Sequence, residues 1–270
     1  MTLSLAWIRT VGGIEELIVA TDSRLRSPFT WDCCPKIAPL SRGDAAICFA
    51  GETYLAYPVM IQLQNALRLH PKSQNRATDL KDLKGYFLEV LNGMRAHMRE
   101  LPSDPKAVGE QTTFFILAGY SWRDSEFLIW TLHFDPNINR FTFRPASWWK
   151  GSDPRKKLAL IGDATDEAKE RLIARLRDSG KLESGGFDME PLQVLRDMIR
   201  EDGHASIGGA PQLVKVYKHL NATPFGVLWP DSSSGARTLL GRPLLDYEIS
   251  SFPMLDPDTL EVRPAQIGAS

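Results

Sequence analysis

The sequence predicts an α+β fold in which two antiparallel sheets carry helices on their outer faces. Short segments with alternating apolar residues open the chain, at residues 2–8 and 16–20. Apolar residues then recur at helical spacing over residues 55–67 and 80–94. Strand-type segments return afterwards, at residues 112–119, 126–134 and 140–143. Strands before and after a helix pair in the sequence favour a fold of two sheets with helices packed on their outer faces.

The first two strands are expected to form a hairpin. Residues 10–13 contain two adjacent glycines and are typical of a turn between the two opening segments. A hairpin brings its two far ends together, so Asp22, just past the second strand, is expected near Thr2. Arg24 follows two residues later and therefore lies on the same side of an extended chain.

A basic residue and a glycine stand at the ends of the next two strands. Lys36 opens residues 36–40, and Gly51 follows residues 45–50 directly before the first helical segment. The opening of the chain thus supplies a hydroxyl, an acid, a base and a glycine, each at the end of a short apolar run. That order is typical of a catalytic layout.

Thr2 is the candidate nucleophile. Removal of Met1, which is usual before a small second residue, leaves Thr2 with a free α-amine beside its own hydroxyl. An amine with a pKa near ~8 can accept the hydroxyl proton close to neutral pH. Nucleophile and base then lie on one residue, which is a known variant of the catalytic triad. No charged-then-apolar signal segment precedes Leu3, so a signal peptidase is not expected to expose Thr2.

This layout resembles the proteasome β-type members of the N-terminal nucleophile hydrolases, including the bacterial ring peptidases. The residues that match in order are Thr2, Asp22, Arg24, Lys36 and Ala50-Gly51. The resemblance implies a four-layer αββα sandwich, with two antiparallel sheets between helix pairs. It implies that the threonine attacks a peptide carbonyl and that Lys36, held by Asp22, lowers the proton affinity around it. Arg24 would support the aspartate, and the Gly51 amide would donate into the oxyanion hole.

The resemblance also assigns residues outside this opening. Asp202 and Ser206, in a loop that ends in two glycines, correspond to an acid and a hydroxyl beside the nucleophile, although the spacer is longer than usual. Residues 25–27, which are Leu25, Arg26 and Ser27, are expected to bind the substrate backbone as an added strand. Phe49 would line the first specificity pocket and leave room only for small or medium side chains.

The second half of the chain completes the fold. Residues 158–163 read as a strand and residues 164–178 as a helix. Asp163 stands where the family has a serine, and it either caps this helix or accepts a hydrogen bond from the threonine amine, with the cap favoured. Asp188 is expected to cap a further helix, and residues 211–217 and 225–229 form a closing hairpin.

The domain organisation follows from these segments. Residues 1–230 are expected to form one domain, since 270 residues with 43% hydrophobic content suffice for one large core. Residues 231–270 read as a C-terminal extension that contacts another subunit or stays mobile. Within it, residues 232–235 are typical of a linker and residues 241–245 of a short strand.

Composition excludes several classes of function. A formal net charge of −1 gives no electrostatic case for nucleic acid or an anionic membrane. No apolar run approaches the ~20 residues that span a bilayer. Three cysteines, of which Cys33 and Cys34 are adjacent, make neither a disulfide framework nor a zinc site. We therefore expect a cytoplasmic protein without metal or cofactor.

The hypothesis is an N-terminal threonine hydrolase that cleaves peptide or amide bonds through an acyl-threonine intermediate. The resemblance implies a homo-oligomeric ring or larger assembly, and leaves open whether an ATPase or other regulator binds. Two alternatives remain. One is a catalytically silent structural or interaction subunit, which would keep Met1, and the other is a hydrolase of small amides.

Overall fold

The computed structural model describes residues 2–26, 28–100, 109–148, 157–183, 186–201, 203–219, 221–233 and 236–265. The strands of its first half are β1 (Leu3–Val11), β2 (Ile14–Thr21), β3 (Leu25–Arg26), β4 (Thr30–Trp31), β5 (Ile37–Pro39), β6 (Ala45–Ala50), β7 (Phe114–Ser121) and β8 (Glu126–Asp135). The later strands are β9 (Arg140–Pro145), β10 (Ser147–Trp148), β11 (Lys157–Gly162), β12 (Gln212–Tyr217), β13 (Asn221–Leu228), β14 (Arg237–Leu239), β15 (Arg242–Pro243), β16 (Met254–Leu255) and β17 (Val262–Arg263). The α-helices are α1 (Thr53–Leu69), α2 (Pro71–Gln74), α3 (Leu80–Arg95), α4 (Thr165–Asp178) and α5 (Glu190–Arg200).

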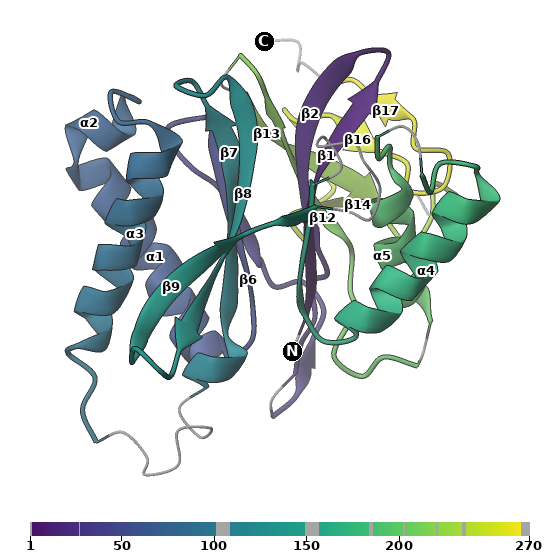
Figure 1. Cartoon of the computed structure of the whole chain (residues 1–270). Helices are drawn as coiled ribbons and strands as arrows, with labels where there is room; N and C mark the ends of the chain where they lie inside the picture. Colours follow the sequence, from purple (N-terminus) through teal and green to yellow (C-terminus); the bar gives the residue numbers. More distant parts are fainter. Residues whose placement is uncertain are drawn as a thin grey trace.

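One sheet is antiparallel and has the strand order β5-β6-β7-β8-β9. Helices α1, α2 and α3 cover its outer face, on the left in Figure 1. Alternate residues of β6 reach this side, so that Ala45, Ile47 and Phe49 pack against the buried faces of α1 and α3. The two helical stripes expected after Gly51 are therefore core, as their spacing indicates.

The other sheet runs β10-β11-β1-β2-β12-β13-β14-β15 and carries α4 and α5 on its outer face (Figure 1). Leu3, Leu5 and Trp7 of β1 point to these helices. Ala6 and Ile8, the alternate residues, point inward and pack against the first sheet. Both faces of β1 are thus buried, one against the helices and the other against the first sheet. The α+β class with antiparallel sheets is confirmed.

The N-termini of three helices differ in how they are capped. The side chain of Asp79 caps α3 by accepting a hydrogen bond from the Lys81 N–H (2.9 Å). The caps expected at Asp163 and Asp188 are wrong. The N-cap of α4 is Ala164, in the left-handed region at φ +51°, because the chain turns sharply after β11. Asp188 instead binds Arg9 of β1 (2.6 Å).

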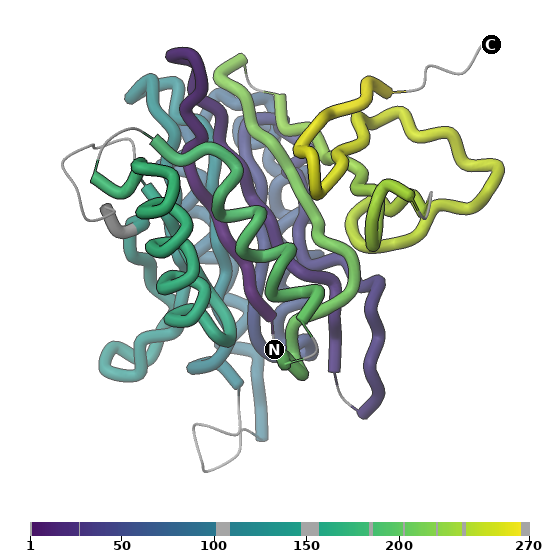
Figure 2. The backbone as a smooth tube through the Cα atoms, turned by 90° about the vertical axis from the view of Figure 1, so that its right-hand side faces the viewer, coloured from purple at the N-terminus to yellow at the C-terminus, as the bar shows by residue number. Residues whose placement is uncertain are grey.

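The segment after residue 230 extends the larger sheet. In its described part, β14 pairs antiparallel with β13, while β16 pairs with β13 in parallel and with β17. Figure 2 shows this segment in yellow and yellow-green along the edge of the molecule next to β13. Gly241, at φ +85°, lies so close to Ser23 that a Cβ there would come within 2.2 Å of the Ser23 Oγ. No described helix has the length and apolar character needed to cross a membrane.

Asp79 also ties α3 to the turn after β7, which gives a testable prediction. Its buried carboxylate accepts hydrogen bonds from the Ser121 hydroxyl (2.9 and 3.0 Å) and the Arg123 N–H (3.2 Å). Burial acts to raise the pKa of Asp79, but these donors and the Lys81 N–H outweigh it and hold the pKa below its usual value. Asp79→Asn should therefore lower the free energy of unfolding by about 1–2 kcal/mol at pH 7.

The sign of the pH dependence follows from the lowered pKa. The stabilisation by the Asp79 carboxylate is complete above the unfolded-state pKa of ~3.9 and is lost as the pH falls through the folded-state pKa. Urea unfolding at pH 7 and at pH 3 should show the gap between the wild-type protein and Asp79→Asn narrowing with acid. Asp82→Asn, which removes an exposed partner of Arg123, should change stability by less than about 1 kcal/mol. If the difference in unfolding free energy between the wild-type protein and Asp79→Asn did not narrow at pH 3, the stabilising role given to the Asp79 carboxylate would be contradicted.

Candidate active site

A buried ion pair lies at the centre of the candidate site. The Lys36 Nζ donates hydrogen bonds to both carboxylate oxygens of Asp22, at 2.9 and 3.0 Å, and both side chains are 0% exposed. The carboxylate also accepts hydrogen bonds from the backbone N–H groups of Leu3 (3.2 Å), Arg24 (3.0 Å) and Gly208 (3.1 Å). These donors compensate the desolvation of the carboxylate, which is what a charge inside a protein requires.

The hydroxyl of Thr2 completes this group. The Lys36 Nζ donates to the Thr2 Oγ1, so the three N–H bonds of the ammonium match three acceptors. The carbonyl of Thr2 accepts a hydrogen bond from the Asp163 N–H (2.7 Å). Gly162 makes this approach possible, since a Cβ on it would lie 1.8 Å from the Thr2 carbonyl oxygen. The threonine is therefore fixed at both its side chain and its backbone.

Burial controls the protonation of the ion pair. It lowers the pKa of Lys36, and the Asp22 carboxylate opposes this shift. It raises the pKa of Asp22, against the opposing effects of the Lys36 ammonium and the N–H groups of Arg24 and Gly208. The ammonium of Lys36 is consequently a better proton donor than that of an exposed lysine.

Gly51 directly follows the last residue of β6. The preceding residue, Ala50, lies close to Gly162, since a Cβ on Gly162 would be 3.2 Å from the Ala50 Cβ. Gly162 in turn contacts the Thr2 carbonyl. The φ of Gly51 is +124°, and a Cβ on it would lie 2.3 Å from the Thr112 carbonyl oxygen, so only glycine fits. Among the residues that the structure describes, the Gly51 N–H has no hydrogen-bond acceptor.

Arg24 contributes to the site through its backbone. Its N–H donates to Asp22, whereas its guanidinium forms a bidentate ion pair with Asp32 (2.7 and 2.9 Å). The guanidinium also donates to the Ile207 carbonyl (3.4 Å). The Arg24 side chain thus joins the loop before Lys36 to the loop before β12.

The loop before β12 reaches the site through a glycine. Ser206 lies two residues before Gly208, whose N–H binds Asp22. Within the described residues, the Ser206 hydroxyl makes no hydrogen bond. Asp202 lies outside the described residues. The structure therefore brings this loop to Asp22 by its backbone, at a position that the sequence analysis did not single out.

The expected substrate-binding residues lie in two different environments. Leu25 and Arg26 form β3, which pairs with β4 in a small hairpin at the surface, and Ser27 lies outside the described residues. Phe49 is 0% exposed and packs edge-on against Tyr57, at 5.2 Å between ring centroids. Its N–H donates to the Lys36 carbonyl (3.1 Å), so the backbone of Phe49 lies beside that of Lys36, while its ring packs in the core with residues of α1 and α3.

The assignment of this site depends on its own geometry. No protein-family model and no curated protein matches this chain. What the geometry supplies is a hydroxyl, an ammonium and a carboxylate in direct contact.

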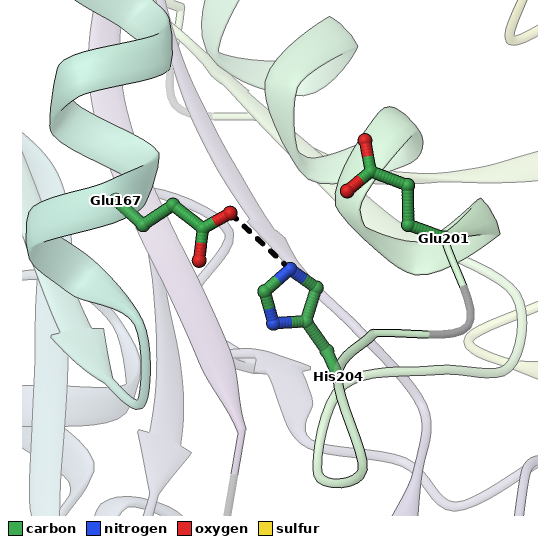
Figure 3. A group of neighbouring side chains, drawn as sticks. All are labelled: Glu167, Glu201 and His204. Atoms are coloured by element: carbon green, nitrogen blue, oxygen red, sulfur yellow. Dashed lines mark ion pairs between the residues drawn. The ribbon is translucent and has the colours of Figure 1, made fainter.

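A second cluster of polar side chains fastens the loop before β12 to α4. Figure 3 shows Glu167, Glu201 and His204, whose potential metal-ligand atoms lie within 4.8 Å of one another. The His204 Nε2 lies 3.5 Å from Glu167. The guanidinium of Arg171 binds both carboxylates, at 2.5 Å from each, and therefore occupies the position that a cation would take. We interpret this cluster as structural.

Three features of the site were not predicted from the sequence, namely Gln212, Gly208 and the contact of Gly162 with Thr2. Gln212 opens β12, a strand that is mostly apolar, and it is 0% exposed. A polar residue at a position where the alternation demands burial was the signal that could have revealed it.

Proposed function

We propose that this chain is an N-terminal threonine hydrolase of the proteasome-like type, which cleaves peptide or amide bonds through an acyl-threonine intermediate. The contact of the Thr2 hydroxyl with the Lys36–Asp22 pair is the observation that carries this proposal. The order of helices, sheet, sheet and helices along Figure 1 supports a four-layer αββα sandwich of the N-terminal nucleophile type. A homo-oligomeric ring belongs to the same proposal.

The reaction starts once Met1 has been removed. The α-amine of Thr2 accepts the proton of its hydroxyl, and the Oγ1 forms a bond to the substrate carbonyl carbon. The carbonyl electron pair moves to oxygen, which gives a tetrahedral oxyanion. A free α-amine has a pKa near ~8, so its basic form is available close to neutral pH.

Lys36 and Asp22 prepare the hydroxyl for this step. The ammonium of Lys36 donates to the Thr2 Oγ1 and stabilises the negative charge that grows on this oxygen as its proton leaves. Asp22 holds the ammonium in place through two hydrogen bonds and balances its charge. Because all three groups are buried, water does not weaken these interactions.

Gly51 supplies the donor for the oxyanion. Its N–H has no acceptor among the described residues, and its backbone is fixed by the close approach of the Thr112 carbonyl. When the oxyanion collapses, the C–N bond breaks and the leaving amine takes the proton held by the Thr2 ammonium. Water then attacks the Thr2 ester, releases the acid and restores the hydroxyl.

One observation favours the alternative of a silent structural subunit. Thr2 is only 1% exposed in the chain that carries Met1, so a substrate cannot reach its hydroxyl in that form. The two functions therefore differ in whether Met1 is removed. Intact mass and N-terminal sequencing of the purified protein distinguish them directly.

The proposal is tested with a threonine-reactive β-lactone. The wild-type protein should lack Met1 and gain one adduct on Thr2, whereas Thr2→Ala should gain none. Thr2→Ala should cost only about 1 kcal/mol of stability, because it removes one hydrogen bond of Lys36. Thr2→Ser keeps the hydroxyl and is the matched control that should still react. Retained Met1 without an adduct would support the silent subunit, and an adduct on Thr2→Ala would remove Thr2 from the mechanism.

A further inference from the structure

Gln212, the first residue of β12, joins the two segments that carry the ion pair. Its Oε1 accepts a hydrogen bond from the Lys36 N–H (3.0 Å). Its Nε2, which carries two N–H bonds, lies within hydrogen-bonding distance of three acceptors, namely the carbonyls of Cys34 (2.7 Å) and Asp22 (3.2 Å) and the Ser23 Oγ (3.0 Å). One fully buried amide thus contacts the backbone of both catalytic candidates.

The backbone on either side of the pair has little regular structure to hold it. Asp22 follows the end of β2, and Lys36 precedes the start of β5. A lysine side chain carries its ammonium on a flexible chain of four carbons. The position of its Nζ is therefore well defined only if its backbone is held in place. On the carbonyl side, Lys36 accepts the Phe49 N–H (3.1 Å), and on the amide side it depends on Gln212.

The C-terminal segment shields this amide from water. Gly241 lies against both atoms of the hydrogen bond between Gln212 and Ser23. A Cβ on Gly241 would be 2.2 Å from the Ser23 Oγ and 3.2 Å from the Gln212 Nε2. The φ of +85° and this lack of space both require glycine. Buried hydrogen bonds of this kind are costly to break, because the released groups find no water.

We propose that Gln212 is a positioning residue of the active site, and that it fixes the backbone of Lys36 relative to Asp22 so that the Nζ reaches the Thr2 hydroxyl. This role rests on the proposed function. It acts through Lys36, and Gln212 itself does not contact the substrate.

Three variants test the proposal. Gln212→Met keeps the length of the side chain and removes both its donor and its acceptor. Gln212→Asn retains the amide on a chain one methylene shorter, and serves where the methionine variant is too unstable. Val216→Ala is the matched control, because Val216 is buried in the same strand and packs between the sheets away from the ion pair.

Two measurements separate positioning from stability. The first is the reaction of Thr2 with the β-lactone, resolved into the maximal inactivation rate and the half-saturating concentration. The second is the amide hydrogen exchange of Lys36, which the Gln212 Oε1 protects in the wild-type protein. We expect Gln212→Met to lower the maximal rate about 10- to 100-fold at unchanged half-saturation, and to accelerate exchange at Lys36. Gln212→Asn should recover part of the rate.

The control decides the interpretation. Val216→Ala should lower the melting temperature without changing the maximal rate or the exchange at Lys36. An equal loss of rate in both variants at matched melting temperature would overturn the proposal, as would unchanged exchange at Lys36 in Gln212→Met. A wild-type protein that forms no adduct on Thr2 would refute the proposed function separately, and the exchange measurement would then decide the structural role of Gln212 alone.

Discussion

Lys36→Met is expected to abolish the reaction of Thr2 and to destabilise the chain. It removes the donor to the Thr2 Oγ1, which should slow acylation by at least about 100-fold. It also leaves the Asp22 carboxylate buried without its counter-ion, which typically costs about 3–5 kcal/mol. Mass spectrometry of the β-lactone adduct and urea unfolding measure the two effects.

Two controls separate the effects. Lys215→Met removes another buried lysine from its acid, Glu16, at 3.1 Å. It should lower stability and leave the reactivity of Thr2 unchanged. The double variant Asp22→Asn with Lys36→Met removes both charges and should recover part of the lost stability without any reactivity. A double variant no more stable than Lys36→Met, or a Lys36→Met protein that still reacts at a similar rate, would contradict the role given to the pair.

Gly162→Ala is expected to have an effect of the same size by a different route. A Cβ at Gly162 would lie 1.8 Å from the Thr2 carbonyl oxygen, so β1 and β11 must separate where they meet. The Asp163 N–H then loses its bond to Thr2, and the hydroxyl moves away from Lys36. We expect a loss of about 3–5 kcal/mol and no adduct on Thr2.

Gly180→Ala is the matched control for this substitution. Gly180 also has a positive φ, of +70°, but a Cβ on it would meet no atom within 4 Å. Its replacement should cost about 1–2 kcal/mol from the left-handed backbone alone and should leave Thr2 reactive. If the two alanine variants were equally stable and equally reactive, the contact of Gly162 with Thr2 would have no role.

Part of this site could be predicted because hairpins are local. The register of β1 on β2 pairs Ser4 with Thr21, and this alone places Asp22 beside the start of β1. Helical spacing predicted which faces of α1 and α3 are buried against the sheet.

The rest could not be predicted because it depends on contacts between distant segments. Gly208, in the loop before β12, and Gln212, at the start of β12, reach Asp22 from about 190 residues further along the chain, and no local pattern reports such a pairing. The expected caps at Asp163 and Asp188 failed for the same reason. A cap depends on the backbone of its own turn, but the partners of these residues lie in or beside β1.

The hydrogen bonds of Asp22 to both Leu3 and Gly208 set the order of events during synthesis. Thr2 leaves the ribosome among the first residues, whereas Gly208 and Gln212 follow roughly 200 residues later, which corresponds to about 10–40 s of translation. Until then the Asp22 carboxylate lacks a donor, Lys36 lacks its anchor, and the threonine at the front of the chain is an ordinary alcohol. Under the proposed function, a nascent chain with a newly freed terminus would therefore not attack its own peptide bonds or those of its neighbours before the fold is complete.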